Sequence, residues 1–421
     1  MGSLRPFRFA CHLNELGWQP TVLCLATAGE ALTADERSRC RGIERIEMAA
    51  PFDRTRRHAS GDFGVAVPRA RSERSAARLA SRLSSALDTW VPLDTWAPLI
   101  AWHGVRLLPR IARLRPDVIF STADPWSSHL AGAWLARRLG VPWVADFRDP
   151  WTLCPFRGQA PPPTLAVNRA FERHVALRAS HVTFTTERTL ARYRAAYPAA
   201  AGRMSCLPNG FDGALLADPI DAELEPLAAE AQLSLCFFGR FRSLSPARAI
   251  LLALERLLER SPAARDAIRL VAVGELPAGD AALASRLGVS DVYHPVEAVP
   301  YEHTLRQLRR HDISLLSTAP ERDDIVPAKL WDYLAARRPI LSLGNNPDVC
   351  ALLASLDAGL QLEPDATDRI AELLERCLLH KRRGEALPIP SRPRERHVDD
   401  FDARRQAERL AGLFDALIAG G

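Results

Sequence analysis

The sequence predicts an α/β protein that is built from two doubly wound parallel sheets. The chain has 421 residues, which is more than one hydrophobic core usually supports. A βαβ unit is clear in the first half, and apolar strands alternate with helical patterns throughout the second half. We therefore expect an N-terminal domain over residues 1–213, a C-terminal domain over 214–395 and a final helical segment over 396–421.

The first half of the chain contains the pattern that defines its sheet. Residues 4–16 predict an amphipathic helix and residues 20–25 a strand, but only Gly2 and Ser3 precede them where a doubly wound domain normally has a strand and a Gly-rich turn. We therefore expect the first strand of the N-terminal domain to be missing. The βαβ unit follows, with strands over 117–122 and 142–146 around a helix over 127–139. A helix over 165–179, a strand over 181–185 and a turn over 207–212 complete this half.

Composition narrows the class of protein. A hydrophobic content of 47% and a charged content of 25% are ordinary for a soluble globular protein. The net charge of +5 suits an anionic ligand or a membrane surface, but it is too small and too diffuse to indicate nucleic acid. The eight cysteines form no C-x-x-C pair, which argues against a zinc site and fits a reducing cytoplasm.

No stretch predicts a signal peptide or a transmembrane span. The most apolar segment, residues 90–108, is interrupted by prolines and charges, and we expect a packed loop and helix there rather than a segment that lies on a membrane. The Arg-rich run over 52–86 is expected to be a solvated face or loop; the functional alternative is that it attracts an anionic acceptor or lipid head groups.

Loops that leave the carboxyl ends of parallel strands are the first candidates for binding. Residues 123–126, with Asp124, and residues 147–151, with Trp151, are two such loops in the first half. The second half predicts six strands, over 233–238, 268–273, 292–295, 313–317, 339–343 and 359–362.

The segment from Asp324 to Leu341 stands out in the second half. Pro327 suits the first turn of a helix, and Pro339 ends that helix before a strand. Lys329 and Asp332 share a polar face of the helix and Asp324 precedes it, so these side chains can converge near a helix N-terminus that favours a diphosphate. Lys329 is one of only two lysines among 55 basic residues. The alternative interpretation is a solvated i,i+3 pair on a surface helix.

Four motifs together resemble one known family. They are Arg5-Pro-Phe-Arg-Phe-Ala10 with Gly17-Trp18, Asp146-Phe-Arg-Asp-Pro-Trp151, Leu207-Pro-Asn-Gly-Phe-Asp212 and Val326-Pro-Ala-Lys-Leu-Trp-Asp-Tyr-Leu334. Over nearly its full length the chain resembles retaining glycosyltransferases of the GT-B fold, family four. The resemblance implies two Rossmann-like domains that face each other across a cleft, with the nucleotide sugar on the second domain and the acceptor on the first. It also implies that the C-terminal helix packs back on the first domain, and that no metal or other cofactor is needed.

The resemblance also assigns roles on the donor side. The family's Glu-x7-Glu corresponds to Asp324, which would contact the donor sugar, and Asp332, which would hold the ribose hydroxyls; Glu321 or Asp323 can replace Asp324. Phosphate contacts correspond to Gly239, Arg240 and Arg242, with Lys329 taking part of that duty. The loop at Gly274 would contact the base.

On the acceptor side, Arg148 and Asp149 stand where many relatives have a His-Asp pair. Arg148 would stabilise charge and Asp149 would orient a hydroxyl, because an arginine cannot act as a base at neutral pH. The same side would include Gly2, Arg5, Asp124, Trp151 and Asn209. The alternative is that Asp149 and Asn209 only shape turns.

The expected function is transfer of a sugar, with retention, from a nucleoside-diphosphate sugar to a hydroxyl of a glycan or lipid-linked acceptor. The expected setting is polysaccharide, cell-envelope or glycoconjugate biosynthesis in the cytoplasm, with an anionic membrane surface as a further partner. A nucleotide-sugar epimerase of the same fold and a non-catalytic sugar-nucleotide-binding relative are the alternatives.

Overall fold

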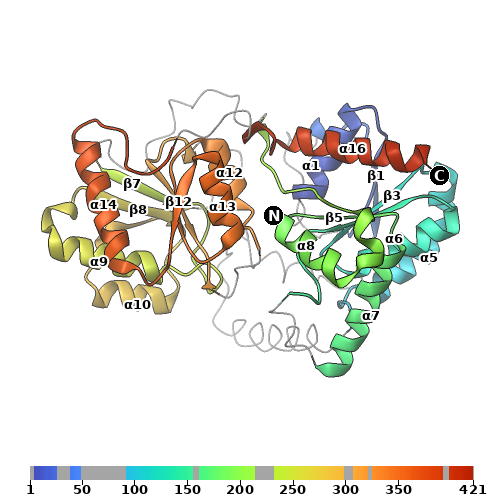
Figure 1. The fold of residues 1–421 in the computed structure, drawn as a ribbon, viewed down its shortest axis with the longest axis horizontal. Helices are drawn as coiled ribbons and strands as arrows, with labels where there is room; N and C mark the ends of the chain where they lie inside the picture. Colours follow the sequence, from blue (N-terminus) through green and yellow to red (C-terminus); the bar gives the residue numbers. More distant parts are fainter. Residues whose placement is uncertain are drawn as a thin grey trace. The chain divides into compact units, whose positions relative to one another are not determined.

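The computed structural model describes residues 4–25, 38–48, 92–154, 161–213, 232–297, 307–320, 325–391 and 398–420. The chain forms two compact units (Figure 1). One comprises Met1–Pro208 together with Ala403–Gly421, and the other comprises Asn209–Asp402. The chain therefore leaves the first unit at Pro208, ahead of the position 213 that the sequence indicated, and returns to it at Ala403.

The first unit contains two parallel sheets. A short sheet pairs β1 (Thr21–Leu25) with β2 (Glu44–Met48). The larger sheet has the order β3 (Ile119–Ala123), β4 (Trp143–Phe147), β5 (His181–Phe184) and β6 (Met204–Cys206). Strands β3 and β4 and the helix between them, α6 (Ser127–Leu139), form the expected βαβ unit. Within the described ranges, no strand joins the sheet of β1 and β2 to the sheet of β3, β4, β5 and β6.

Helices cover both faces of the larger sheet. On one face, α1 (Leu4–Glu15) and α16 (Ala403–Ala419) pack against each other and against Val144, so the last helix of the chain belongs to the first unit. Trp126, Phe147 and Phe184 belong to the core on the other face. The remaining elements of this unit are α5 (Ala97–Leu114), α7 (Pro162–Arg178), α8 (Glu187–Ala196) and η2 (Pro198–Arg203).

The second unit is built on one sheet of six parallel strands. Their order is β12 (Gly359–Leu362), β11 (Ile340–Leu343), β10 (Ile313–Ser317), β7 (Leu233–Phe237), β8 (Ile268–Val273) and β9 (Tyr293–Val296). The sequence predicted all six, with ends that differ by no more than one residue. The order runs outward from β7 in both directions, so the topological switch point lies between β7 and β10. Ligands of doubly wound sheets bind at such a point, beyond the carboxyl ends of the strands.

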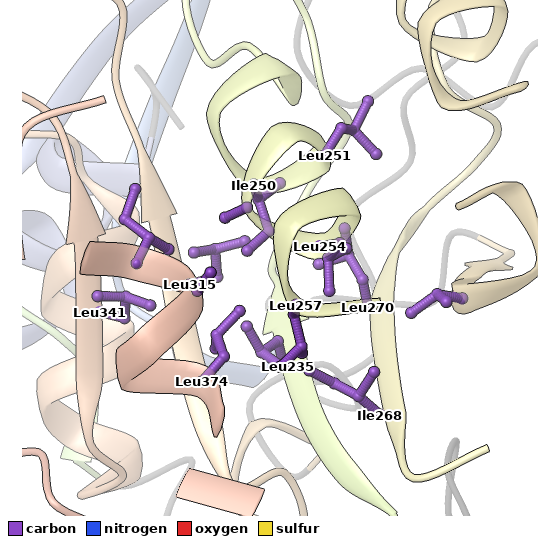
Figure 2. Close-up of a cluster of buried hydrophobic side chains, with 14 of the residues drawn as sticks. Leu235, Ile250, Leu251, Leu254, Leu257, Ile268, Leu270, Leu315, Leu341 and Leu374 are labelled. Atoms are coloured by element: carbon purple, nitrogen blue, oxygen red, sulfur yellow. The ribbon is translucent and has the colours of Figure 1, made fainter. Parts of the chain in front are cut away.

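Leucine and isoleucine side chains fill the core of the second unit. Figure 2 shows Leu235 and Leu315 of the sheet facing Leu254 of α9 (Arg248–Arg260) and Leu374 of α14 (Thr367–Arg382). The buried side chains of α9 recur every three or four residues, which places them on one helix face. The other elements are η4 (Pro262–Ala264), α10 (Ala278–Arg286), η5 (Ser290–Val292), α12 (Lys329–Ala336) and α13 (Pro347–Leu356). In the part of the chain described, no helix has the length and apolar character to cross a membrane.

Candidate functional site

The candidate site lies at the carboxyl edge of the second unit's sheet, where β7 ends beside α12. Gly239 follows β7 with a φ of +117°, a conformation that favours glycine. A Cβ atom added to Gly239 would lie 3.7 Å from the Nζ atom of Lys329. The Lys329 ammonium therefore lies directly against the backbone of Gly239.

An aromatic platform supports Lys329. Its Nζ atom lies 3.7 Å from the centroid of the Phe237 ring, and this ring stacks on Phe241 with centroids 4.0 Å apart. Burial, reinforced by the nearby charge of Arg242 and opposed by Cys236, lowers the pKa of Lys329 from 10.5 to about 7. An anion bound here would favour the charged ammonium and so be bound more tightly when Lys329 is protonated.

The loop after β7 is anchored to β10. The Ser317 hydroxyl donates to the Pro246 carbonyl at 2.6 Å, and the Ala319 N–H donates to the Leu244 carbonyl at 3.2 Å. Phe241 is buried, whereas its neighbours Arg240 and Arg242 are exposed. The loop thus holds two guanidinium groups at the switch point, on either side of a buried ring.

Tyr333 fixes α12 to the same two strands. Its hydroxyl accepts from the Phe238 N–H at 2.7 Å and donates to the Leu315 carbonyl at 3.0 Å. Burial raises the pKa of Tyr333 well above 10, which keeps this donor protonated. Asp332, next to it, is 2% exposed. The alternative of a solvated Lys329–Asp332 pair on a surface helix is therefore wrong, because every residue from Leu330 to Ala336 is buried.

Gly274 lies at the same edge, after β8. The Val273 N–H donates to the Gly239 carbonyl at 3.1 Å, and the Gly274 N–H donates to Val296 at 2.7 Å. The structure thus brings Gly239, Gly274 and Lys329 together with the two arginines. Asp324 lies outside the described residues, as do Glu321 and Asp323, so its role stays a prediction.

In the first unit, Arg148 and Asp124 meet at the carboxyl edge of the larger sheet. The Nε of Arg148 donates to the Ala123 carbonyl and its Nη2 donates to the Asp124 carbonyl at 3.4 Å. The Thr185 hydroxyl donates to the Arg148 carbonyl at 2.5 Å. Asp149 follows Arg148 and is half-buried. The end of β4 therefore presents a guanidinium and a carboxylate side by side in sequence.

Trp151 occupies the core rather than an open binding surface. It is 1% exposed and stacks on Trp126 with centroids 4.5 Å apart. The backbone N–H of Trp151 donates to the Tyr193 hydroxyl at 2.8 Å. The buried ring and the backbone N–H of Trp151 thus anchor the loop that carries Asp149, and burial leaves little of the ring for an acceptor to contact.

Arg5 is tied into a buried network with Asp146. The Arg5 Nε and Nη2 atoms donate to the two carboxylate oxygens of Asp146 at 3.0 and 2.8 Å, and Arg5 also donates to the Leu207 and Pro208 carbonyls. Burial alone would raise the pKa of Asp146, but the Arg5 charge and hydrogen bonds lower it on balance. This network joins α1 to β4 and the end of the first unit.

Of the two remaining predicted residues, the structure places one in the other unit and does not describe the other. Asn209, expected on the acceptor side of the first domain, begins the second unit and is half-buried. Gly2 lies outside the described residues, as does the Arg-rich run over 52–86.

Sequence reasoning missed a buried carboxylate that shapes the loop after Asp149. Glu172 accepts from the Thr152 N–H at 2.6 Å, from the Thr152 hydroxyl at 2.9 Å and from the Tyr193 and Tyr197 hydroxyls at 2.7 Å. No local signal separates Glu172 from the exposed charges of α7, because its donors come from other elements. Glu172 therefore holds the loop at Thr152, after Asp149, whereas Arg148 precedes Asp149.

Residues 7–214 match the family model of Glycosyltransferase Family 4. The chain belongs to glycosyltransferase family 4. No curated protein matches its sequence. The sucrose-phosphate synthase of Thermosynechococcus elongatus has a similar structure, with a TM-score of 0.65 and 13% identity over 98% of this chain and 92% of that one.

Two further solved structures resemble this family-4 chain. HepE of Anabaena, in complex with UDP, has a TM-score of 0.64 and 15% identity over 99% of this chain and 96% of that one. A glycosyltransferase of Rickettsia africae has a TM-score of 0.64 and 13% identity over 100% and 96%. At these identities the likeness shows the fold, which is GT-B.

Proposed function

We propose that this family-4 protein transfers a sugar from a nucleoside-diphosphate sugar to a hydroxyl acceptor with retention of configuration. The observation that carries the proposal is the Lys329 ammonium against Gly239 at the switch point, beside the exposed Arg240 and Arg242. Structural neighbours add support, since HepE was solved with UDP and a trehalose-phosphate synthase of Burkholderia xenovorans is UDP-forming.

The second unit supplies the donor site in this proposal. As the bond from the sugar to the diphosphate breaks, negative charge grows on the leaving group, and Lys329, Arg240 and Arg242 stabilise it. These cations do so without a metal ion or other cofactor. Asp332 holds the ribose hydroxyls, Asp324 contacts the sugar, and the backbone at Gly274 contacts the base.

The first unit supplies acceptor contacts. Asp149 orients the attacking hydroxyl and Arg148 stabilises charge near it. The new bond forms from the acceptor oxygen to the anomeric carbon on the face that the diphosphate leaves, and the acceptor proton passes to the diphosphate. Glycans and lipid-linked glycans of polysaccharide, cell-envelope or glycoconjugate biosynthesis in the cytoplasm are the acceptor class that we propose.

A thermal-shift panel of UDP, GDP, dTDP and ADP sugars tests the donor site. We expect one nucleotide to raise the melting temperature in a concentration-dependent way. The stabilising donor is then incubated with glycan acceptors, with and without a chelator, and the anomeric configuration of the product is read by NMR. Free nucleotide and an altered sugar without an acceptor would indicate an epimerase instead. No stabilisation by any of the four, in folded protein, would contradict the proposal.

A further inference from the structure

Helix α5 presents an apolar strip to solvent. Trp102 is 65% exposed and Val105 is 62% exposed, more than any other large hydrophobic side chain in the described ranges. Pro109 and Ala112, both exposed, follow at spacings of four and three residues. Residues with this spacing lie on one side of a helix, so the four side chains form a continuous strip.

This strip is distinct from the face that packs into the protein. Ile100, His103, Gly104 and Ile111 are the buried residues of α5, and the helix packs against α6. An ordinary surface helix has one apolar face, directed to the core, and a polar face directed to water. Helix α5 has apolar side chains in both directions, and those of the strip are exposed.

Three arginines flank the strip on one side. Arg106, Arg110 and Arg113 are exposed and follow Trp102 around the helix, and α5 contains no acidic residue. Arg110 also pairs with Glu44 at 2.8 Å. The charge of this helix is therefore entirely positive, which complements an anionic surface.

We propose that this α5 face, formed by Trp102, Val105, Pro109, Ala112 and the three arginines, docks on an anionic phospholipid bilayer. Tryptophan prefers the level of the lipid head groups, where its ring is partly apolar and its N–H stays wet. Arginines beside it reach lipid phosphates while their stems cover apolar surface. A helix with these features lies in the interface and does not span the bilayer.

The proposal places a membrane contact on α5, which overlaps the apolar segment 90–108 that the sequence predicts to be packed rather than to lie on a membrane. The Arg-rich run over 52–86, the segment that the sequence offered for lipid head groups, lies outside the described residues. The α5 contact is independent of the donor site, since α5 belongs to the first unit and the nucleotide contacts to the second. Failure of lipid binding and failure of nucleotide binding are therefore separate results.

Vesicle co-sedimentation of the full chain tests the proposal. We expect binding to phosphatidylcholine vesicles that contain phosphatidylglycerol, weaker binding to phosphatidylcholine alone, and weakening by salt. Trp102→Ser with Val105→Ser should reduce the partition coefficient at least about tenfold. Arg106→Gln and Arg113→Gln should each reduce it by roughly fivefold on the anionic vesicles only.

The matched control is Val167→Ser on α7 of the same unit, where the valine is 38% exposed. It should bind vesicles as the unaltered protein does. Bromine-labelled phospholipid provides a second measurement, because it should quench tryptophan fluorescence less in Trp102→Phe than in the unaltered protein. Equal vesicle binding and equal quenching in the α5 variants would overturn the proposal. So would self-association, or capture of a protein partner, that needs Trp102 while no vesicle binding occurs.

Discussion

The Nζ atom of Lys329 lies 3.7 Å from the centroid of the ring of Phe237, which is the last residue of the central strand β7. A cation over an aromatic face is attracted to the ring while its outer side stays available to an anion. Burial lowers the pKa of Lys329 to about 7, so at neutral pH the side chain is only partly charged. A bound anion would favour its charged form. Diphosphate affinity should therefore depend both on the presence of Lys329 and on its protonation.

Lys329→Ala should weaken binding of the stabilising nucleoside diphosphate by roughly 10- to 100-fold, the usual effect of losing one charged hydrogen bond. Titration calorimetry measures the change. Lys381→Ala is the matched control, because it removes the other lysine of the chain. Lys381 pairs with Asp312 at 2.5 Å, and Asp312 lies at the amino end of β10, away from the candidate site at the carboxyl edge. Donor affinity that falls equally in both variants would show that the effect is not local to the site.

Diphosphate binding should weaken as pH rises above about 7. A bound diphosphate raises the pKa of Lys329, so the ammonium contribution is complete below the free-state pKa and is lost as pH rises from there toward the bound-state pKa. Calorimetry at pH 8 in buffers of different ionisation enthalpy should show proton uptake on binding. In Lys329→Ala this uptake should disappear, and its persistence would assign the proton to another group.

Arg5→Ala should lower the free energy of unfolding by about 3–5 kcal/mol, because it leaves the buried Asp146 carboxylate without its cation. Denaturant unfolding measures this loss. The double variant Arg5→Ala with Asp146→Ala should lose less than the sum of the single variants, since the two groups act as a pair. Strict additivity would mean that the network does not couple them.

Stability should also fall in acid because of buried histidines. Burial lowers the pKa of His311 from 6.5 to about 4, and neither ring nitrogen has a hydrogen-bond partner in the described residues. The unfolded chain binds the proton more readily, so stability is complete above pH 6.5 and is lost between there and about pH 4, by about 3 kcal/mol for this group.

Unfolding measured at several pH values checks the histidine effect. His311→Leu should flatten the acid slope of the transition that belongs to the second unit. His129 of the first unit, whose pKa burial lowers to about 3, should continue to contribute in that variant. An unchanged slope in His311→Leu would exclude His311 as a source of the acid sensitivity.

Local signals predicted the second unit's strands because most of them are short, apolar and bounded by residues that stop them, as Pro339 precedes β11. They also placed Gly239 and Lys329 at strand and helix ends. The sequence could not show that these residues touch, because β7 and α12 are far apart in the chain and meet only through the sheet order.

The residues that differ most from their predicted roles are those with distant partners. Arg5 was predicted to contact an acceptor, yet it is buried and pairs with Asp146, which lies 141 residues away in the chain. Trp151 followed a strand, as a binding residue does, but the ring that covers it, Trp126, comes from a different loop. Whether a charged or aromatic side chain is buried depends on contacts with residues that are distant in the chain. The spacing of apolar residues along the sequence does not predict those contacts.

A crystal structure of the protein with the stabilising nucleoside diphosphate tests the central claim most directly. We predict the diphosphate at the carboxyl edge of the second unit's sheet, with a phosphate oxygen within hydrogen-bond distance of the Lys329 Nζ and beside the Gly239 backbone. A diphosphate bound away from Gly239, with no contact to Lys329 or to Arg240 and Arg242, would contradict the account.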